Sequence, residues 1–157
     1  MEHTNTTHHQ GRQRMVVDAS GTILGRLASY AAKQVLNGNE IVIVNAEKAV
    51  ISGRKQRIIN DFKQRLEFRT LGSQKKAPKH PRRPDTYVRR VIRGMLPWKK
   101  ARGQNAFRRL KVYISTPEDL EKAHLTYVPD AQKTLRPAMT VGELLTIFGW
   151  KNPLEET

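Results

Sequence analysis

The residues in this sequence best suited to chemistry are the lysines and arginines gathered between Ser73 and Lys111. This stretch holds fourteen Lys or Arg residues and one acid, Asp85, and so carries +13 of the +15 formal charges of the chain. Like charges at this density repel each other in a compact protein, and a bound polyanion offsets the repulsion. Arginine binds phosphate through paired hydrogen bonds, and lysine supplies a mobile point charge. The stretch therefore predicts binding to the phosphates of a folded RNA.

An ordinary solvated basic face is the plain alternative, and it is disfavoured because such faces mix charges of both signs. Residues 71–84, which overlap the start of this stretch, are rich in proline, which excludes a regular helix and favours an extended arm along RNA. Such a segment can stay disordered until RNA binds. The candidate RNA contacts in this arm are Lys75, Lys76, Lys79, His80, Arg82 and Arg83.

A helix is expected from Thr86 to Met95, with Asp85 as its cap. Its apolar residues at helical spacing, Val88, Val91, Ile92 and Met95, are expected to face the core. The other sides of the helix carry three further candidate contacts, Arg89, Arg90 and Arg93. Trp98, just beyond the helix, can stack on a splayed base or pack against the helix end, and the sequence favours neither.

No group of residues in the sequence is arranged for catalysis, a metal or a cofactor. The chain has no cysteine, which removes disulfides, thiolate chemistry and cysteine zinc sites. No histidine belongs to a metal motif, and residues 21–25 enter a helix without either nucleotide-binding fingerprint. We therefore expect that the protein is not an enzyme and that it binds no cofactor. The alternatives are an RNA-processing or RNA-modifying enzyme with a basic groove, or an mRNA-binding regulator of translation.

The elements that must position the basic residues begin with a strand, a helix and a strand. Residues 15–19 and the β-branched run 41–45 are typical of strands, and residues 23–36 between them place apolar side chains on one helical face. This order predicts a right-handed βαβ unit and an α/β fold. Residues 48–51 form a further possible strand.

The rest of the chain predicts shorter elements. Further helices are expected from Ser52 to about Phe68 and over residues 102–110, followed by a strand at 112–114. A helix begins at Thr116-Pro117, because proline suits the first helical position. Residues 125–139 are expected to be irregular. Last, the capping-box spacing of Thr140 and Glu143 begins a closing helix.

Length and charge distribution indicate one domain. We expect a flexible N-terminal extension at residues 1–14 and a single RNA-binding α/β domain at 15–157, with its basic part at 73–111 and an acidic part at 112–157 packed on the protein body. No apolar run reaches the roughly 18 residues of a membrane span, and the N-terminus lacks the apolar segment of a signal peptide. A cytoplasmic location follows, with no membrane partner and no small-molecule substrate.

Three blocks of the sequence resemble a known family. Residues 93–97 (Arg-Gly-Met-Leu-Pro), Gly103 and residues 107–113 closely resemble the G-M-L-P, G and L-x-V-Y signature of the universal large-subunit ribosomal protein thirteen. Residues 17–28 are similar to the start of that family, and residues 44–53 to its next block. The blocks occur in the family's order. The short connection before the second strand and the C-terminal portion resemble archaeal members.

The resemblance implies a three-layer α/β/α fold around a four-stranded parallel sheet, to which the charge pattern adds the basic proline-rich arm. It also implies a structural constituent of the large ribosomal subunit that binds its ribosomal RNA and supports assembly among neighbouring ribosomal proteins. Carried over residue by residue, RNA contact falls on Arg93, Lys99, Lys100, Arg102, Arg108, Arg109 and Lys111. Arg54 and Lys55, after Ser52-Gly53, are added as candidates. Gly94, Met95 and Pro97 are expected to shape the helix junction.

Overall fold

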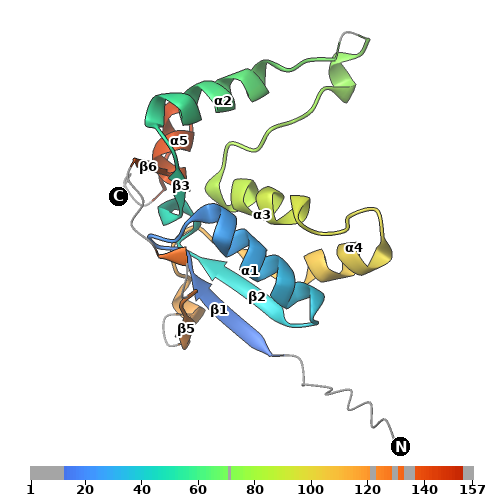
Figure 1. Cartoon of the computed structure of the whole chain (residues 1–157), viewed down its shortest axis with the longest axis vertical. Helices are drawn as coiled ribbons and strands as arrows, with labels where there is room; N and C mark the ends of the chain where they lie inside the picture. The colour runs from blue at the N-terminus through green and yellow to red at the C-terminus, as the bar shows by residue number, and fades with distance from the viewer. Residues whose placement is uncertain (1–12, 71, 121–122, 129–130, 133–136, 154–157) are drawn as a thin grey trace, which may run out of the picture.

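A parallel sheet lies at the centre of the computed structural model, which describes residues 13–70, 72–120, 123–128, 131–132 and 137–153 (Figure 1). The sheet has four strands in the order β4-β2-β1-β5. Their bounds are Arg14–Asp18 for β1, Glu40–Val44 for β2, Leu110–Val112 for β4 and Leu125–Thr126 for β5. The α/β class and the four-stranded parallel sheet are confirmed. Of the expected extension, residues 1–12 lie outside the described part, and Arg14 already belongs to β1.

The expected βαβ unit consists of β1, α1 (Leu24–Leu36) and β2. β1 and β2 run parallel in a register from Arg14 beside Glu40 to Asp18 beside Val44. α1 ends just before Gly38, whose φ of 103° is a conformation that glycine accepts without steric cost. The sequence pattern therefore identified this unit correctly.

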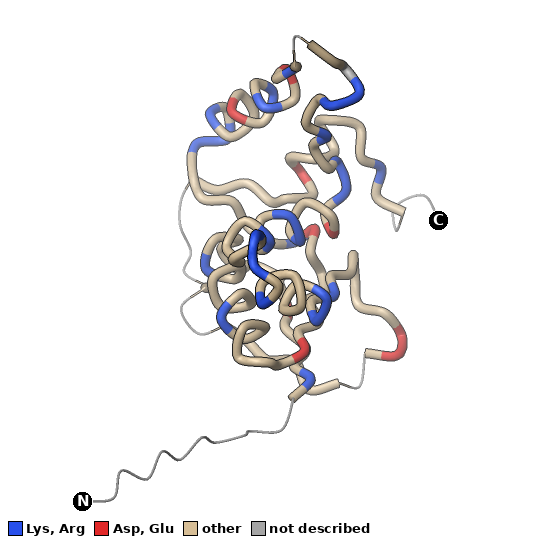
Figure 2. Tube along the Cα trace, turned by 90° about the vertical axis from the view of Figure 1, so that its right-hand side faces the viewer, with Lys and Arg blue, Asp and Glu red and all other residues tan. Residues whose placement is uncertain are grey.

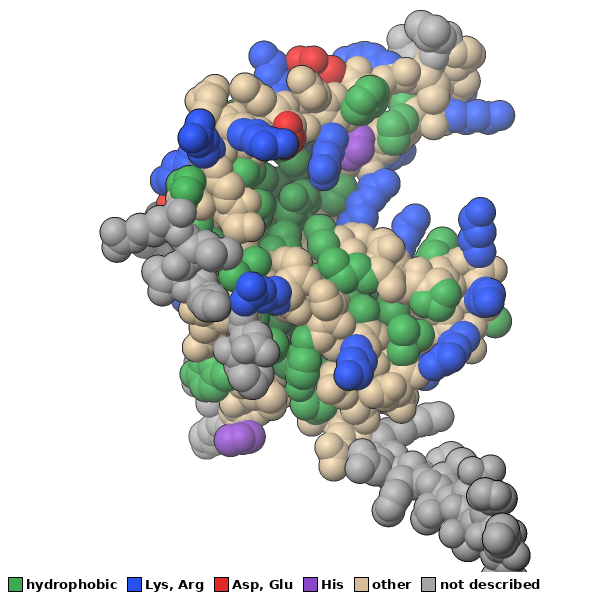
Figure 3. Space-filling view, in the orientation of Figure 1, with side chains coloured by type: hydrophobic (Ala, Val, Ile, Leu, Met, Phe, Trp, Pro, Cys, Tyr) green, Lys and Arg blue, Asp and Glu red, His purple; other side chains and the backbone are tan. Residues whose placement is uncertain are grey.

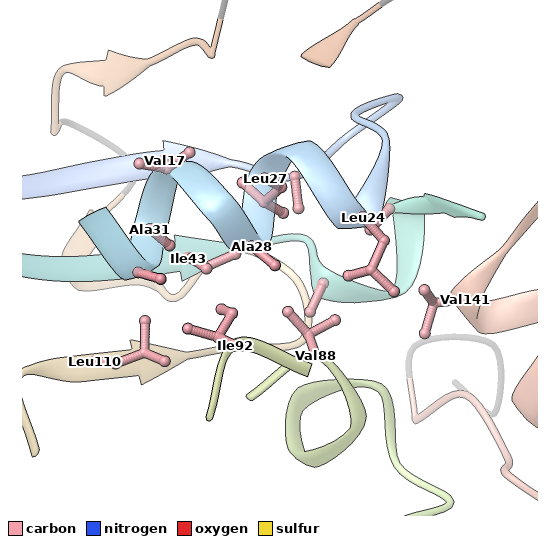
Figure 4. Packing of buried hydrophobic residues seen from close by; sticks show 14 of the residues in the cluster. Val17, Leu24, Leu27, Ala28, Ala31, Ile43, Val88, Ile92, Leu110 and Val141 are labelled. Carbon is pink, nitrogen blue, oxygen red and sulfur yellow. The ribbon is translucent and has the colours of Figure 1, made fainter. Parts of the chain in front are cut away.

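One face of the sheet is covered by α1, α3 (Pro84–Gly94) and α4 (Ala101–Arg108). Figure 4 shows Val88 and Ile92 of α3 pointing toward α1, and both side chains are fully buried. Burying one such side chain stabilises a fold by about 1.5–3 kcal/mol. Met95 was expected to continue this stripe, but it is 44% exposed, because α3 has already ended at Gly94.

The opposite face of the sheet has a much thinner cover. Val16, Val42 and Val44 pack there against Leu120, in the 3-10 turn η3 (Glu118–Leu120). The helix expected to start at Thr116-Pro117 is therefore a single 3-10 turn within the described residues. No helix in the described part of the chain is long and apolar enough to cross a membrane.

A second, antiparallel pair of strands lies beside the main sheet. It joins β3 (Val50–Ser52) to β6 (Ala138–Thr140), and it is flanked by α2 (Lys55–Glu67) and α5 (Val141–Ile147). α5 begins with the expected capping box, in which the Thr140 hydroxyl accepts from the Glu143 amide at 3.1 Å and the Glu143 carboxylate accepts from the Thr140 amide at 3.3 Å.

The expectation that residues 125–139 are irregular was wrong in part, because β5 lies inside this range and β6 begins there. These strands have two and three residues, which is too short for an alternating pattern to be visible. The strand expected at 112–114 is also displaced, since β4 ends at Val112.

A separate proline-rich arm does not appear among the described residues. Between α2 and α3 the chain forms only the 3-10 turn η2 (Gln74–Lys76). Its far end is held to the body, because Pro84 is the buried first residue of α3 and Arg90 donates a hydrogen bond to the Lys79 carbonyl. Proline suits this first helical position, so the N-cap is Arg83, and the expected cap Asp85 lies in the first turn instead.

The junction between α3 and α4 depends on Gly103, at which α4 meets the preceding backbone. A β-carbon at this position would lie 2.2 Å from the Pro97 carbonyl oxygen. By contrast, a β-carbon at Gly94 would meet nothing within 4 Å, and the φ of Gly94 is not positive. The prediction that Gly94, Met95 and Pro97 shape the junction therefore fits Pro97, but this structure gives no packing reason for Gly94.

We expect Gly103→Ala to destabilise the fold by about 1–3 kcal/mol, because the added methyl group forces backbone apart in a packed junction. Thermal unfolding followed by circular dichroism measures the effect. Gly94→Ala is the matched control and should leave the melting temperature nearly unchanged. Equal melting temperatures for the two variants would contradict the close approach at Gly103.

A polar contact between the ends of β1 and β2 makes stability depend on pH. Burial alone raises the pKa of the Asp18 carboxyl, but hydrogen bonds from the Ser20 amide and the Asn45 side chain, both at 3.0 Å, and the positive charge of Lys48 outweigh this effect. The pKa of Asp18 is therefore lowered. Its contribution to stability is present above the unfolded-state pKa of about 4 and is lost as the pH falls through the folded-state value.

Asp18→Asn should therefore lower the melting temperature at neutral pH and make the remaining stability less sensitive to acid. Melting curves between pH 2 and pH 7 test this expectation. Asp61→Asn is a suitable control, because the Asp61 carboxylate is exposed on α2 and its ion pair with Arg57 has a distance of 4.0 Å. Parallel pH profiles for the wild type and Asp18→Asn would show that Asp18 has no such role.

Candidate nucleic-acid interface

The densest basic surface lies on α3, α4 and the loop between them. We define this α3–α4 surface by six exposed side chains: Arg89, Arg93, Lys99, Lys100, Arg102 and Arg108. None of them forms a salt bridge within the described part of the chain. Figure 2 shows this concentration of Lys and Arg along the helices that face the viewer. The surface therefore combines a high positive charge with side chains that are free to bind an anion.

Two of these arginines are held in place by aromatic rings. The Arg89 guanidinium lies 4.6 Å from the centre of the Phe107 ring, and the Arg93 guanidinium lies 4.6 Å from the centre of the Trp98 ring. The two rings contact each other edge to face at 5.2 Å. A guanidinium stacked in this way keeps its N–H edge available for phosphate, and less side-chain entropy is lost on binding.

The same contacts help to decide between the two expected roles of Trp98, which are stacking on an RNA base and packing against the helix end. One ring face is covered by Arg93, the ring packs against Phe107, and the side chain remains 37% exposed. Trp98 thus has an intramolecular packing role. Its direct contact with an RNA base stays a prediction.

The segment between α2 and α3 contributes a second basic group. Lys75, Lys76, Lys79 and Arg82 are exposed, and Arg83 pairs with Asp85 at 3.2 Å. Figure 3 shows a hollow between this segment and the α3–α4 region, with Lys and Arg side chains on both sides of it. Arg90 faces the segment rather than solvent alone, because it donates to the Lys79 carbonyl.

Four of the candidate residues lie apart from these two groups. Arg109 is half-buried and donates a hydrogen bond of 2.9 Å to the Val35 carbonyl at the end of α1, which indicates a structural role. Lys111 is in register with Val42, so it lies on the thinly covered face of the sheet. Arg54 and Lys55 lie at the start of α2, where Lys55 pairs with Glu143 at 3.5 Å.

Sequence reasoning missed Arg65, a basic residue that faces the segment from α2. Arg65 is exposed and lines cavities with Phe62 and Tyr87, and it forms no salt bridge among the described residues. Its spacing of three residues from the apolar Phe62 places both side chains near the same side of the helix. This spacing could have indicated from the sequence that Arg65 lies beside Phe62, but it does not reveal that α3 lies opposite α2.

The turn that leads into α1, where α/β proteins commonly bind phosphate, uses two of its amides within the protein. At the start of α1, the Ile23 amide donates to the Ala131 carbonyl at 2.8 Å, and the Gly21 amide donates to the Lys48 carbonyl at 3.2 Å. These amides are therefore already used by the protein itself, as in an ordinary turn. Within the described residues, no group of three or more His, Cys, Asp or Glu side chains is placed to hold a metal.

Comparison with known proteins shows the family of the chain. The profile of the family described as "Ribosomal protein L13" matches residues 12–119. The chain is 43% identical over 143 residues to the "Large ribosomal subunit protein uL13" of Methanopyrus kandleri, an alignment that covers 88% of each chain. It is 45% identical to the protein of the same name from Methanococcus maripaludis, over 87% of this chain and 98% of the relative.

A third relative with this name, from Methanocaldococcus jannaschii, is 53% identical over 67% of this chain and 77% of its own length. The family profile covers well over half of the chain, and the relatives above are archaeal, as the sequence resemblance indicated. This chain belongs to the ribosomal protein L13 family.

Proposed function

We propose that the chain is a structural component of the large ribosomal subunit, in which it binds ribosomal RNA and supports assembly next to other ribosomal proteins. Family membership supports this proposal, since the matched relatives are large-subunit proteins by name. A ribosomal protein is not an enzyme, so the same membership decides against the RNA-modifying alternative.

The observation that carries the RNA-binding part is the α3–α4 surface. Six exposed basic side chains lie there without acidic partners in the described residues, and two are stacked on rings that limit their motion. RNA helices are recognised largely through their shape and phosphates, so a rigid array of cations suits this target. The segment between α2 and α3 adds cations on the other side of the hollow (Figure 3).

The remaining candidates contribute to the proposal to different extents. Arg109 supports the surface indirectly, because its hydrogen bond to Val35 ties α4 to the end of α1. Three candidates lie away from the α3–α4 surface: Lys111, Arg54 and Lys55. They would contact RNA only if the RNA, or a second RNA segment, continued around the protein. We therefore place the main contact on α3 and α4.

The double variant Arg89→Ala/Arg93→Ala should bind large-subunit ribosomal RNA more weakly. The slope of log affinity against log salt concentration should become shallower by about 1 to 2, because each lost phosphate contact removes nearly one released counterion. Filter binding or fluorescence anisotropy at several salt concentrations measures this slope.

The matched control removes two exposed cations outside the α3–α4 surface, Lys33 and Arg57. This control should retain the wild-type slope, and both variants should melt like the wild type. An unchanged slope for the α3 variant, or an equal loss in the control, would refute the assignment of α3 to RNA.

Sedimentation of cell extract tests the placement in the subunit. The protein is followed by antibody through sucrose gradients at low and at high magnesium. We expect it to migrate with the large subunit under both conditions, because many phosphate contacts hold it there. Recovery only in light fractions would reject the ribosomal placement.

A further inference from the structure

A small pocket lies between α2, α3 and the segment that joins them, apart from the α3–α4 surface. Its volume is about 250 Å³. Its lining combines four apolar or aromatic side chains with three nitrogen-bearing ones: Phe62, Pro81, Tyr87 and Val91, with Arg65, His80 and Arg90. An apolar cavity with a few converging polar groups is the usual form of a ligand site.

The rings give the pocket a stacking character. Phe62 and Tyr87 meet edge to face, with ring centres 5.9 Å apart. Phe62 is buried, and the centre of its ring lies 4.7 Å from that of Phe148, the residue that follows α5, so a second ring supports Phe62 on the side of α5. Tyr87 is half-buried and Pro81 closes the side formed by the connecting segment. The pocket therefore has rigid apolar walls on both helices.

Polar groups surround these walls. The His80 imidazole lines the pocket, and its Nε2 is buried without a hydrogen-bond partner among the residues that the structure describes. A buried polar atom without a partner is unfavourable, and a ligand that donates or accepts a hydrogen bond relieves this cost. Arg65 and Tyr87 line the same pocket. Burial raises the pKa of the Tyr87 phenol, and the positive charge of Arg65 opposes this rise.

We propose that this pocket binds one unstacked RNA nucleotide, with the base against Tyr87, Phe62 and Pro81. Its phosphate contacts the guanidinium groups of Arg65 and Arg90, and the base edge bonds to His80 Nε2. The inference deepens the proposed function, because it supplies a base-reading site beside the phosphate-binding surface.

A nucleotide fits this pocket better than a phosphate ion alone or an apolar group alone. Bare phosphate would leave the aromatic and proline walls unused, and a purely apolar group would leave the Arg65 charge and the imidazole nitrogen of His80 without a polar contact. Single-stranded RNA is recognised by splayed bases that stack on aromatic side chains and bond through their edges. The pocket also opens beside the basic segment that flanks the hollow, so the RNA that reaches α3 passes close to it (Figure 3).

The test uses the full-length protein and four mononucleotides, AMP, GMP, CMP and UMP, with inorganic phosphate as reference. Signals of His80, Arg65 and Tyr87 are followed by NMR during each titration. We expect at least one mononucleotide to shift these signals with an affinity about tenfold or more above that of phosphate, because base stacking adds to the anion contact.

Arg65→Gln and His80→Ala should each weaken mononucleotide binding about tenfold, since each removes a polar contact. Lys63→Gln is the matched control for Arg65, because it removes one exposed positive charge from the same helix outside the pocket. The control should bind mononucleotides like the wild type. Melting temperatures confirm that all variants are folded, and the exposed Arg65 tests the proposal even where His80→Ala is unstable.

Three outcomes would overturn the proposal. Equal affinities for phosphate and mononucleotides indicate an anion site only. A response to N-acetyltyrosinamide but not to nucleotides indicates a pocket for a protein side chain. No response to any probe shows that the pocket has no such ligand. Binding of the wild type and of Arg65→Gln to large-subunit RNA is measured in parallel. A failure of the wild type to bind that RNA would reject the proposed function separately from the pocket.

Discussion

The α3–α4 surface depends on the packing of Val88 and Ile92, two side chains of α3, against the protein body. Both side chains are fully enclosed between α3, α1 and the sheet, while Arg89 and Arg93 lie next to them in sequence and point outward. The apolar stripe thus fixes the rotation of the helix, and the rotation fixes where the guanidinium groups lie. Without this anchor, mutual repulsion among the cations would favour separation of α3 and α4 from the body.

The protein holds its cations together with few acidic partners. Within the described residues, Arg83 alone among the bases of the 73–111 stretch forms a salt bridge, whereas Arg89 and Arg93 stack on rings and Arg90 and Arg109 donate to backbone carbonyls. A neutral partner orients a guanidinium without cancelling its charge. The field at the surface therefore stays positive, as binding to a polyanion requires.

The fold itself is of a kind that often carries catalysis. In open α/β sheets, ligands commonly bind at the carboxyl ends of the strands, where neighbouring connections leave in opposite directions. Here the amide of Ile23 is bonded to Ala131, and Val128 and Ala131 are buried beside it. The polypeptide itself therefore uses part of this crevice, whereas the exposed basic side chains lie on the outer surfaces of α3 and α4. Under the proposed function, RNA binding depends on this outer surface rather than on the ends of the strands.

The sequence by itself determined the βαβ unit, the helices of the basic stretch, the closing capping box and the positive charge that predicts RNA binding. These features are local, because helical spacing, caps and β-branched runs act over a few residues. Tertiary structure alone decided that β5 completes the sheet, that Pro84 begins α3, and that Arg90 and Arg109 are bonded to distant carbonyls. It also decided that Arg65 and His80 share a pocket. Two-residue strands have no readable period, and side chains far apart in the chain meet only when the core has placed their helices.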